Sequence, residues 1–131
     1  MKYRREEAFR FAFGEPVDAL FHIIKLDDKP VTSSPGKAKI LDVSPEGLRI
    51  SSELNIPDIT SKTITLTIAF TINDTSFNLD GIIVWKKMIG NITSYGIKLD
   101  LKEQHVKVKL IEELKVYSKK HINNNKKGKS I

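Results

Sequence analysis

The sequence predicts a mostly β fold, in which about six antiparallel strands form a barrel or sandwich and a C-terminal amphipathic α-helix follows them. The first observation is a series of short stretches in which apolar and polar residues alternate, separated by turn-forming residues, with no helical crossover between them. The second is a change of apolar period after Asp100, from two residues to three and four. Strands joined by short turns pair antiparallel, so a parallel α/β sheet is disfavoured.

The strands are expected where alternation is clearest, and the turns where Gly, Pro, Asn and Asp cluster. A long loop at 27–37 contains two prolines and a glycine, and Ser-Pro-Glu-Gly at 44–47 predicts a tight turn. Asn73-Asp74 and Gly90-Asn91 predict two hairpin turns. The expected strands are residues 17–26, 37–43, 48–52, 63–72, 75–87 and 92–100.

The segment 101–121 predicts an amphipathic helix of about five turns, which docks on the barrel or on a second copy of itself. Asp100 as N-cap, with Glu103 three positions later, resembles a capping box. Residues 122–131 lack apolar periodicity, so we expect a disordered tail there. The apolar positions of the helix are Val106, Leu110, Ile111, Leu114 and Tyr117.

Charge and composition exclude several classes of protein. The 131-residue chain has a formal charge of +6, but the surplus lies in residues 102–131, and the rest is neutral. The strands do not interleave aromatic with basic residues, so we expect no nucleic-acid binding. There is no cysteine, hence no disulfide or thiolate zinc site. Without a long apolar run or a secretory signal, we expect a soluble cytoplasmic protein with no membrane insertion.

Catalytic and metal sites are not expected. The three histidines, His22, His105 and His121, form no metal-ligand pattern, and the last two are about 24 Å apart along a helix. The sequence contains neither a nucleophile elbow nor a phosphate-binding loop of the GxxxxGK[ST] type. We therefore predict no enzyme activity, no metal and no cofactor.

Two elements remain distinctive: a cluster of arginines at the N-terminus and the turn 42–47. Guanidinium groups bind phosphate through two parallel hydrogen bonds and also stack on purine faces. A carboxylate and a hydroxyl on a rigid turn can hydrogen-bond a guanine edge, and a glycine lets a ligand approach the backbone. Together they predict a ligand that is both anionic and guanine-bearing.

The turn resembles a motif of the PilZ domains, bacterial receptors for cyclic di-GMP. Asp42, Ser44 and Gly47 match the family pattern [Asp/Asn]-x-Ser-x-x-Gly without a gap. The stretches 80–87, which contains a Trp, and 95–100, which begins with Tyr-Gly, are similar to two late strands of the family. The likeness covers about residues 4–100.

The N-terminal arginines depart from the family's Arg-x-x-x-Arg spacing. Arg10 takes the role of the second arginine, but four positions before it stands Glu6. Arg5, five positions before Arg10, stands in for the first arginine, and Arg4 is the alternative to Arg5. The resemblance thus implies ligand contacts from Arg5, Arg10, Asp42, Ser44 and Gly47.

The resemblance also implies the organisation of the chain. It predicts a six-stranded antiparallel PilZ-like β-barrel within a domain of residues 1–121. Residues 1–15 form the arginine arm, 16–100 the barrel and 101–121 the helix, and 122–131 remain as the basic tail.

Two functions follow from the resemblance. The first is a receptor that changes conformation on binding cyclic di-GMP and signals to an unidentified effector protein. The alternative, motivated by the shifted arginine, is a degenerate PilZ domain without nucleotide binding that serves protein interaction or oligomerisation. The helix would allow a homo-oligomer in either case.

Overall fold

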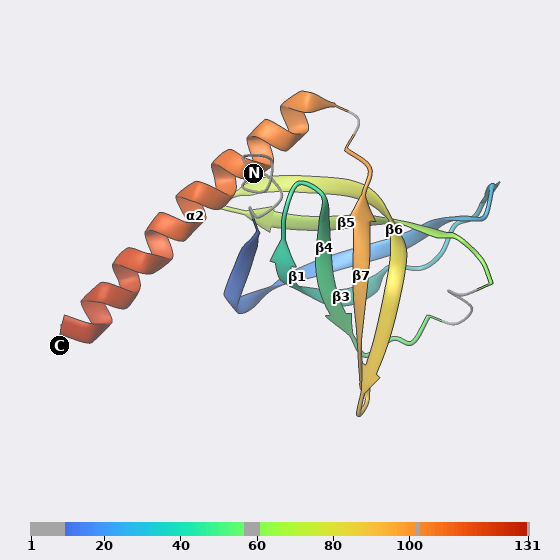
Figure 1. The fold of residues 1–131 in the computed structure, drawn as a ribbon, viewed down its shortest axis with the longest axis horizontal. Helices are drawn as coiled ribbons and strands as arrows, with labels where there is room; N and C mark the ends of the chain where they lie inside the picture. Colours follow the sequence, from blue (N-terminus) through green and yellow to red (C-terminus); the bar gives the residue numbers. More distant parts are fainter. Residues whose placement is uncertain (1–9, 57–60, 102, 131) are drawn as a thin grey trace, which may run out of the picture.

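In a computed structural model of the chain, the described residues form seven strands and one helix around one core (Figure 1). The structure describes residues 10–56, 61–101 and 103–130, and for residues 121–130 the backbone alone. Its elements are β1 (Phe11–Leu26), β2 (Lys29–Pro30), β3 (Gly36–Val43), β4 (Gly47–Ser52), β5 (Ile64–Ile72), β6 (Thr75–Ile89), β7 (Ile92–Leu99) and α2 (Gln104–Ser130).

The strands form a closed antiparallel barrel, which confirms the predicted fold class. Their order is β2-β1-β3-β4-β7-β6-β5, and β5 pairs back with β1. Six strands make the barrel wall, because β2 is a two-residue pairing at the end of β1. Closure leaves β1 hydrogen-bonded to β3 on one side and β5 on the other.

Alternation of side chains fills the barrel. β5 shows the pattern most clearly, with Ile64, Leu66, Ile68, Phe70 and Ile72 buried and the intervening threonines and alanine more exposed. The predicted turn at Asn73-Asp74 follows, with φ of 51° and 68°, as a two-residue hairpin turn requires.

β1 begins earlier than the sequence suggested. Phe11 pairs with Val43 and Ala12 with Asp42, before an irregularity that ends where Val17 pairs with Ile40. Residues 11–15, expected in the arginine arm, are therefore strand. A contact between residues distant in sequence stabilises this extension of β1, because Phe11 packs on the helix.

The helix packs on the barrel as predicted, but its limits differ. Leu110 and Leu114 are fully buried, and the Tyr117 ring lies edge-on to those of Phe11 and Phe13, with centroids 5.7 and 5.3 Å away. Docking on the barrel is thus the alternative that the structure shows.

Asp100 is not the N-cap. Its backbone N–H donates to the Asp80 carbonyl at 2.9 Å, so this residue continues the sheet and the helix starts at Gln104. At the other end the helix backbone runs to Ser130 through the segment expected to be a disordered tail. No proline interrupts that segment, and extending an existing helix costs far less than starting one.

Candidate functional site

The turn between β3 and β4 is built by Ser44. Its backbone N–H donates to the Gly47 carbonyl at 2.8 Å, and its Oγ accepts hydrogen bonds from the N–H groups of Glu46 and Gly47, both at 3.2 Å. Ser44 is buried, so its hydroxyl serves the turn in this structure and does not face solvent.

Gly47 is required by the neighbouring strand. A Cβ at this position would lie 2.5 Å from the Ile97 carbonyl oxygen of β7, which is closer than atoms can approach. The absence of a side chain therefore lets β4 pair with β7 from its first residue, where Gly47 lies opposite Lys98.

Asp42 is a buried carboxylate held by two arginines. It lies directly across from Arg49 in the β3–β4 pair, and its Oδ2 accepts from Arg49 Nε at 2.9 Å. Its Oδ1 accepts from Arg10 Nη1. The Asp42 side chain is 8% exposed, whereas those of Arg10 and Arg49 are 52% and 47% exposed. The pairing compensates the buried charge and leaves both guanidinium groups within reach of solvent.

Trp85 lies beside these arginines because of a β-bulge in β6. Ile83 pairs with Ile97 and Trp85 with Gly96, so Val84 is an extra residue. Trp85 consequently faces outward and is 42% exposed. Its indole covers Gly96, where a Cβ would come within 2.0 Å of the indole Nε1.

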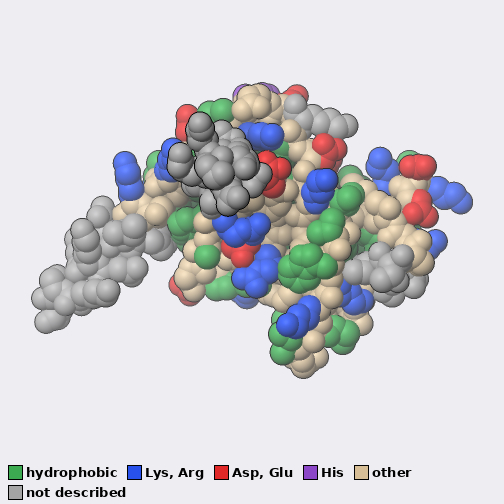
Figure 2. Space-filling view, in the orientation of Figure 1, with side chains coloured by type: hydrophobic (Ala, Val, Ile, Leu, Met, Phe, Trp, Pro, Cys, Tyr) green, Lys and Arg blue, Asp and Glu red, His purple; other side chains and the backbone are tan. Residues whose placement is uncertain are grey.

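These residues form a row across four strands, at the floor of an open groove of about 570 Å³. The register places Asp42 beside Arg49, Arg49 beside Gly96, and Gly96 beside Trp85. Lys and Arg side chains gather on this face of the molecule (Figure 2). The groove is lined by Arg10, Asp42, Glu46, Gly47, Leu48, Arg49, Val84, Trp85, Gly96, Ile97 and Lys98.

The structure brings four of the predicted site residues together. Arg10, Asp42, Ser44 and Gly47 meet at the β3–β4 turn, the first two in one ion pair. Arg4 and Arg5 lie outside the described residues.

Among the lining residues that were not predicted site residues, three carry a cationic or aromatic side chain suited to the ligand: Arg49, Trp85 and Lys98. Both Arg49 and Trp85 point outward from their strands. A signal for Arg49 existed in the sequence, because a hairpin closing at 44–47 places residues 42 and 49 opposite each other. No comparable local signal marks Lys98.

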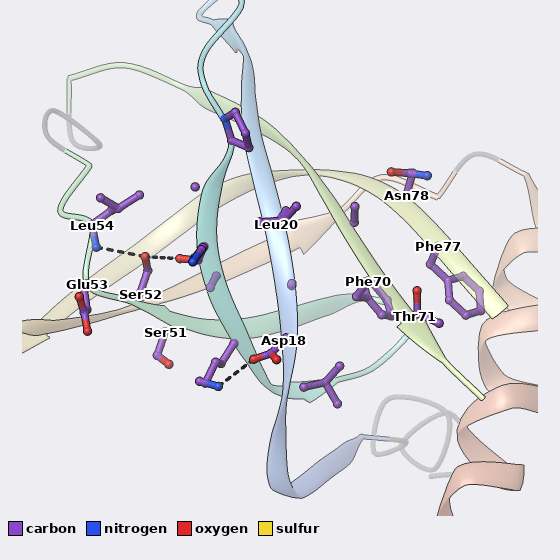
Figure 3. Close-up of a pocket in the computed structure, with 18 of the residues that line it drawn as sticks. Asp18, Leu20, Ser51, Ser52, Glu53, Leu54, Phe70, Thr71, Phe77 and Asn78 are labelled. Carbon is purple, nitrogen blue, oxygen red and sulfur yellow. Dashed lines mark hydrogen bonds and ion pairs between the residues drawn. The ribbon is translucent and has the colours of Figure 1, made fainter. Parts of the chain in front are cut away.

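A second, larger cavity of about 1310 Å³ lies elsewhere on the barrel (Figure 3). Asp18 and Leu20 of β1 lie near its middle, with Leu54 on one side and Phe77 on the other. In its wall the Lys39 ammonium donates to Asp18 at 2.7 Å, and this bond lowers the pKa of Asp18. The described residues that line this cavity include none of the motif positions, so it is not the site that the motif predicts.

Two other kinds of feature, a metal-binding cluster and a membrane-spanning helix, are absent from the described part of the chain. Its His, Asp and Glu side chains form no group of three suited to a metal ion. Its helix lacks the apolar length needed to cross a membrane.

Comparison with known proteins identifies a family for the chain. No curated protein matches the chain significantly. The family model of the PilZ domain, however, matches residues 4–115, which include the arginines, the turn, the whole barrel and the first part of α2. With a match over most of its length, the chain belongs to the PilZ domain family.

Proposed function

We propose that the protein is a cyclic di-GMP receptor that changes conformation on binding and signals to a partner protein. PilZ domains are a receptor family for this nucleotide and are not a known class of enzyme. The observation that carries the proposal is the row of Arg10, Asp42, Arg49 and Trp85 along one exposed groove. The ligand is the nucleotide itself, with no cofactor, and the proposal places the receptor in a bacterial cytoplasm.

The groove offers a partner for each part of this ligand. Arg10 and Arg49 are half exposed and can bind phosphate oxygens through paired hydrogen bonds. Lys98 adds a third cation at the rim. The Trp85 indole provides an aromatic surface on which a purine can stack, and Asp42 can accept hydrogen bonds from the N–H groups of a guanine edge.

The N-terminal arm would complete the site. Arg5, or Arg4 in its place, precedes Arg10 by only a few residues, so an arm folding over the groove brings another guanidinium to the phosphates. Ser44 and Gly47 support this arrangement indirectly, because they fix the turn from which Asp42 projects.

A route from the groove to the helix supports the signalling half of the proposal. Arg10 is followed by Phe11, whose ring packs edge-on against Phe13 at 4.9 Å and Tyr117 at 5.7 Å between centroids. When Arg10 exchanges its bond with Asp42 for one with a phosphate, the start of β1 moves. The packing of Tyr117 against Phe11 and Phe13 then changes. The face of α2 then offers the partner a surface that differs between the two states.

Calorimetric titration with cyclic di-GMP tests the proposal. We expect saturable heat from the wild type and a loss of about 1.5–3 kcal/mol of binding free energy, roughly 10- to 150-fold in Kd, for Arg10→Ala and for Arg49→Ala. Lys39→Ala is the matched control, since it removes an exposed cation paired with Asp18, away from the groove. Absence of heat from the folded wild type at high micromolar ligand would overturn the proposal.

A degenerate PilZ module is the second candidate, and the occupied carboxylate favours it. Both oxygens of Asp42 already accept hydrogen bonds from Arg10 and Arg49, so the polar groups of the groove have partners without a ligand. Exposed Val108 and Val116 on α2 would then serve protein contacts. Light scattering separates the candidates: an oligomer that forms without cyclic di-GMP and does not respond to it supports the module, whereas ligand-dependent assembly supports the receptor.

A further inference from the structure

The β6–β7 hairpin ends in a projecting tip with exposed apolar side chains. We define the hairpin tip as residues 87–93; it extends beyond the barrel wall (Figure 1). Met88 is 55% exposed, Ile89 64% and Ile92 38%. Single exposed apolar residues are ordinary, but three within five positions at the end of one protrusion form a local patch.

Along the hairpin itself the charge has a single sign. The stretch from Gly81 to Leu99 contains three lysines and no aspartate or glutamate. Lys86 Nζ donates to the Ile56 carbonyl at 2.7 Å, whereas Lys87 and Lys98 are exposed. Figure 2 shows hydrophobic and basic side chains side by side at this end of the molecule.

The strand register aligns part of the tip with the groove. Alternation along β6 places Trp85, Lys87 and Ile89 on one face, and Ile89 pairs with Ile92 across the turn. A strip of aromatic, basic and apolar side chains therefore runs from the groove to the tip.

The hairpin tip is held in place before anything binds to it. The buried Tyr95 hydroxyl donates to the Leu54 carbonyl at 2.6 Å and accepts from the Ile56 N–H at 2.8 Å. With the Lys86 bond to the same loop, these contacts brace the base of the hairpin against residues 54–56. Little conformational entropy is then lost when the tip binds.

We propose that the hairpin tip docks on an anionic lipid surface. Isoleucine and methionine side chains can enter the boundary between headgroups and acyl chains, while Lys87 lies level with the phosphates. A convex tip fits a fluid bilayer, which needs no matching cavity. With seven residues, it is small beside a standard protein interface, which takes about 20–30 residues on each partner. This contact is made at the membrane surface. It therefore does not require the long apolar segment that insertion across the bilayer needs, and which the sequence lacks.

Flotation with lipid vesicles tests the proposal on the full chain. We expect the wild type to float with vesicles of phosphatidylcholine and phosphatidylglycerol in equal parts, and to stay unbound with phosphatidylcholine alone. Trp85 is the one tryptophan of the chain, and it lies on the same strip. Its emission should shift to shorter wavelength with the anionic vesicles only.

Variants separate the tip from the lysine-rich helix, which can also attract anionic lipid. Ile89→Asn keeps the charge, and we expect it to lower the vesicle partition coefficient by about tenfold. Lys87→Gln should lower it by a smaller factor and reduce its salt dependence. Val116→Asn, which removes a similarly exposed apolar side chain on α2, is the matched control and should bind as the wild type does.

Two results would overturn the proposal. One is equal partition of Ile89→Asn and the wild type, which would assign lipid attraction to the helix. The other is no binding to anionic vesicles, which would leave the tip to a protein partner. Neither depends on cyclic di-GMP, so they are distinguishable from a failure of the proposed receptor function.

Discussion

The two halves of β6 differ in the burial of their side chains. Before Val84, the side chains of Phe77, Leu79 and Ile83 point inward and are at most 7% exposed. After it, Trp85 and Met88 are about half exposed. One extra residue separates the halves, and it reverses which positions face the core. One strand can thus contribute to both the core and the candidate binding groove when a bulge shifts its register.

The largest difference between the halves is expected for truncation of matched apolar side chains. Leu79→Ala removes a side chain that is 2% exposed, and should lower the free energy of unfolding by about 2–5 kcal/mol. Met88→Ala, in the outer half, should change it by less than about 0.5 kcal/mol. Urea unfolding followed by circular dichroism measures both, and similar losses would show that the tip is packed in solution.

Two glycines test the same contrast at the level of the backbone. A Cβ on Gly81 would lie 2.6 Å from the Lys98 carbonyl oxygen, so Gly81→Ala must displace backbone and should cost about 2–3 kcal/mol. A Cβ on Gly96 would meet the Trp85 indole, which can turn into solvent. Gly96→Ala should cost about 1 kcal/mol or less and shift Trp85 fluorescence to longer wavelength. The reverse order of stability would show that the Trp85 indole cannot turn away from Gly96.

Tyr95→Phe probes what braces the outer half. The change leaves the Ile56 N–H without the hydroxyl as acceptor, and should cost about 1–3 kcal/mol of stability. Hydrogen exchange at the Ile56 amide should become faster. Unchanged exchange there would show that the hydroxyl does not hold the loop.

The same residue gives a pH dependence. Burial raises the pKa of Tyr95 above its ordinary value of 10.0. A raised pKa in the folded state means that its contribution to stability is complete below pH 10.0 and declines as pH rises through the higher value. We expect Tyr95→Phe to remove that part of the alkaline loss seen in thermal unfolding of the wild type.

The smallest effect on stability is expected at the contact between α2 and the turn that precedes β6. Asn73 Nδ2 donates to the Glu113 carbonyl at 2.8 Å and to its carboxylate at 3.0 Å. The bond from Asn73 and that from Lys109 lower the pKa of Glu113 below its ordinary 4.5. Its stabilising effect is therefore present above pH 4.5 and lost as pH falls through the lowered value.

Glu113→Gln should remove this acidic dependence and slightly lower the melting temperature near neutral pH, where the wild-type carboxylate contributes. Asn73→Gly provides the partner test, because glycine accepts the φ of 51° at this turn but cannot donate to Glu113. If both variants retain the wild-type acid profile, the contact does not contribute in solution.

The local patterns of the sequence predicted the strands and hairpin turns, because alternation and turn chemistry act over a few residues. The bulge was not predictable in this way. Residues 82–85 are all apolar, so the sequence does not show which of them face the core. The position of Asp100 was missed for a related reason. Its bond to Asp80 is a contact across the sheet, which outweighs the local capping preference.

The candidate site was predicted in part. The motif located Arg10, Asp42 and the turn, because those spacings are written along the chain. The roles of Arg49 and Trp85 depend on which strands are neighbours and in which register they pair. That information emerges only when the barrel closes.

The double pairing of Asp42 has a consequence for how the proposed receptor would respond to signal concentration. The Asp42 carboxylate competes with the phosphates of the nucleotide for each arginine and is tethered at a fixed effective concentration, so the measured affinity is a difference between two sets of bonds. Substitutions in neighbouring residues that strengthen or weaken these internal ion pairs would then change the nucleotide concentration at which the receptor switches. Such changes would retune the threshold without altering any group that touches the messenger.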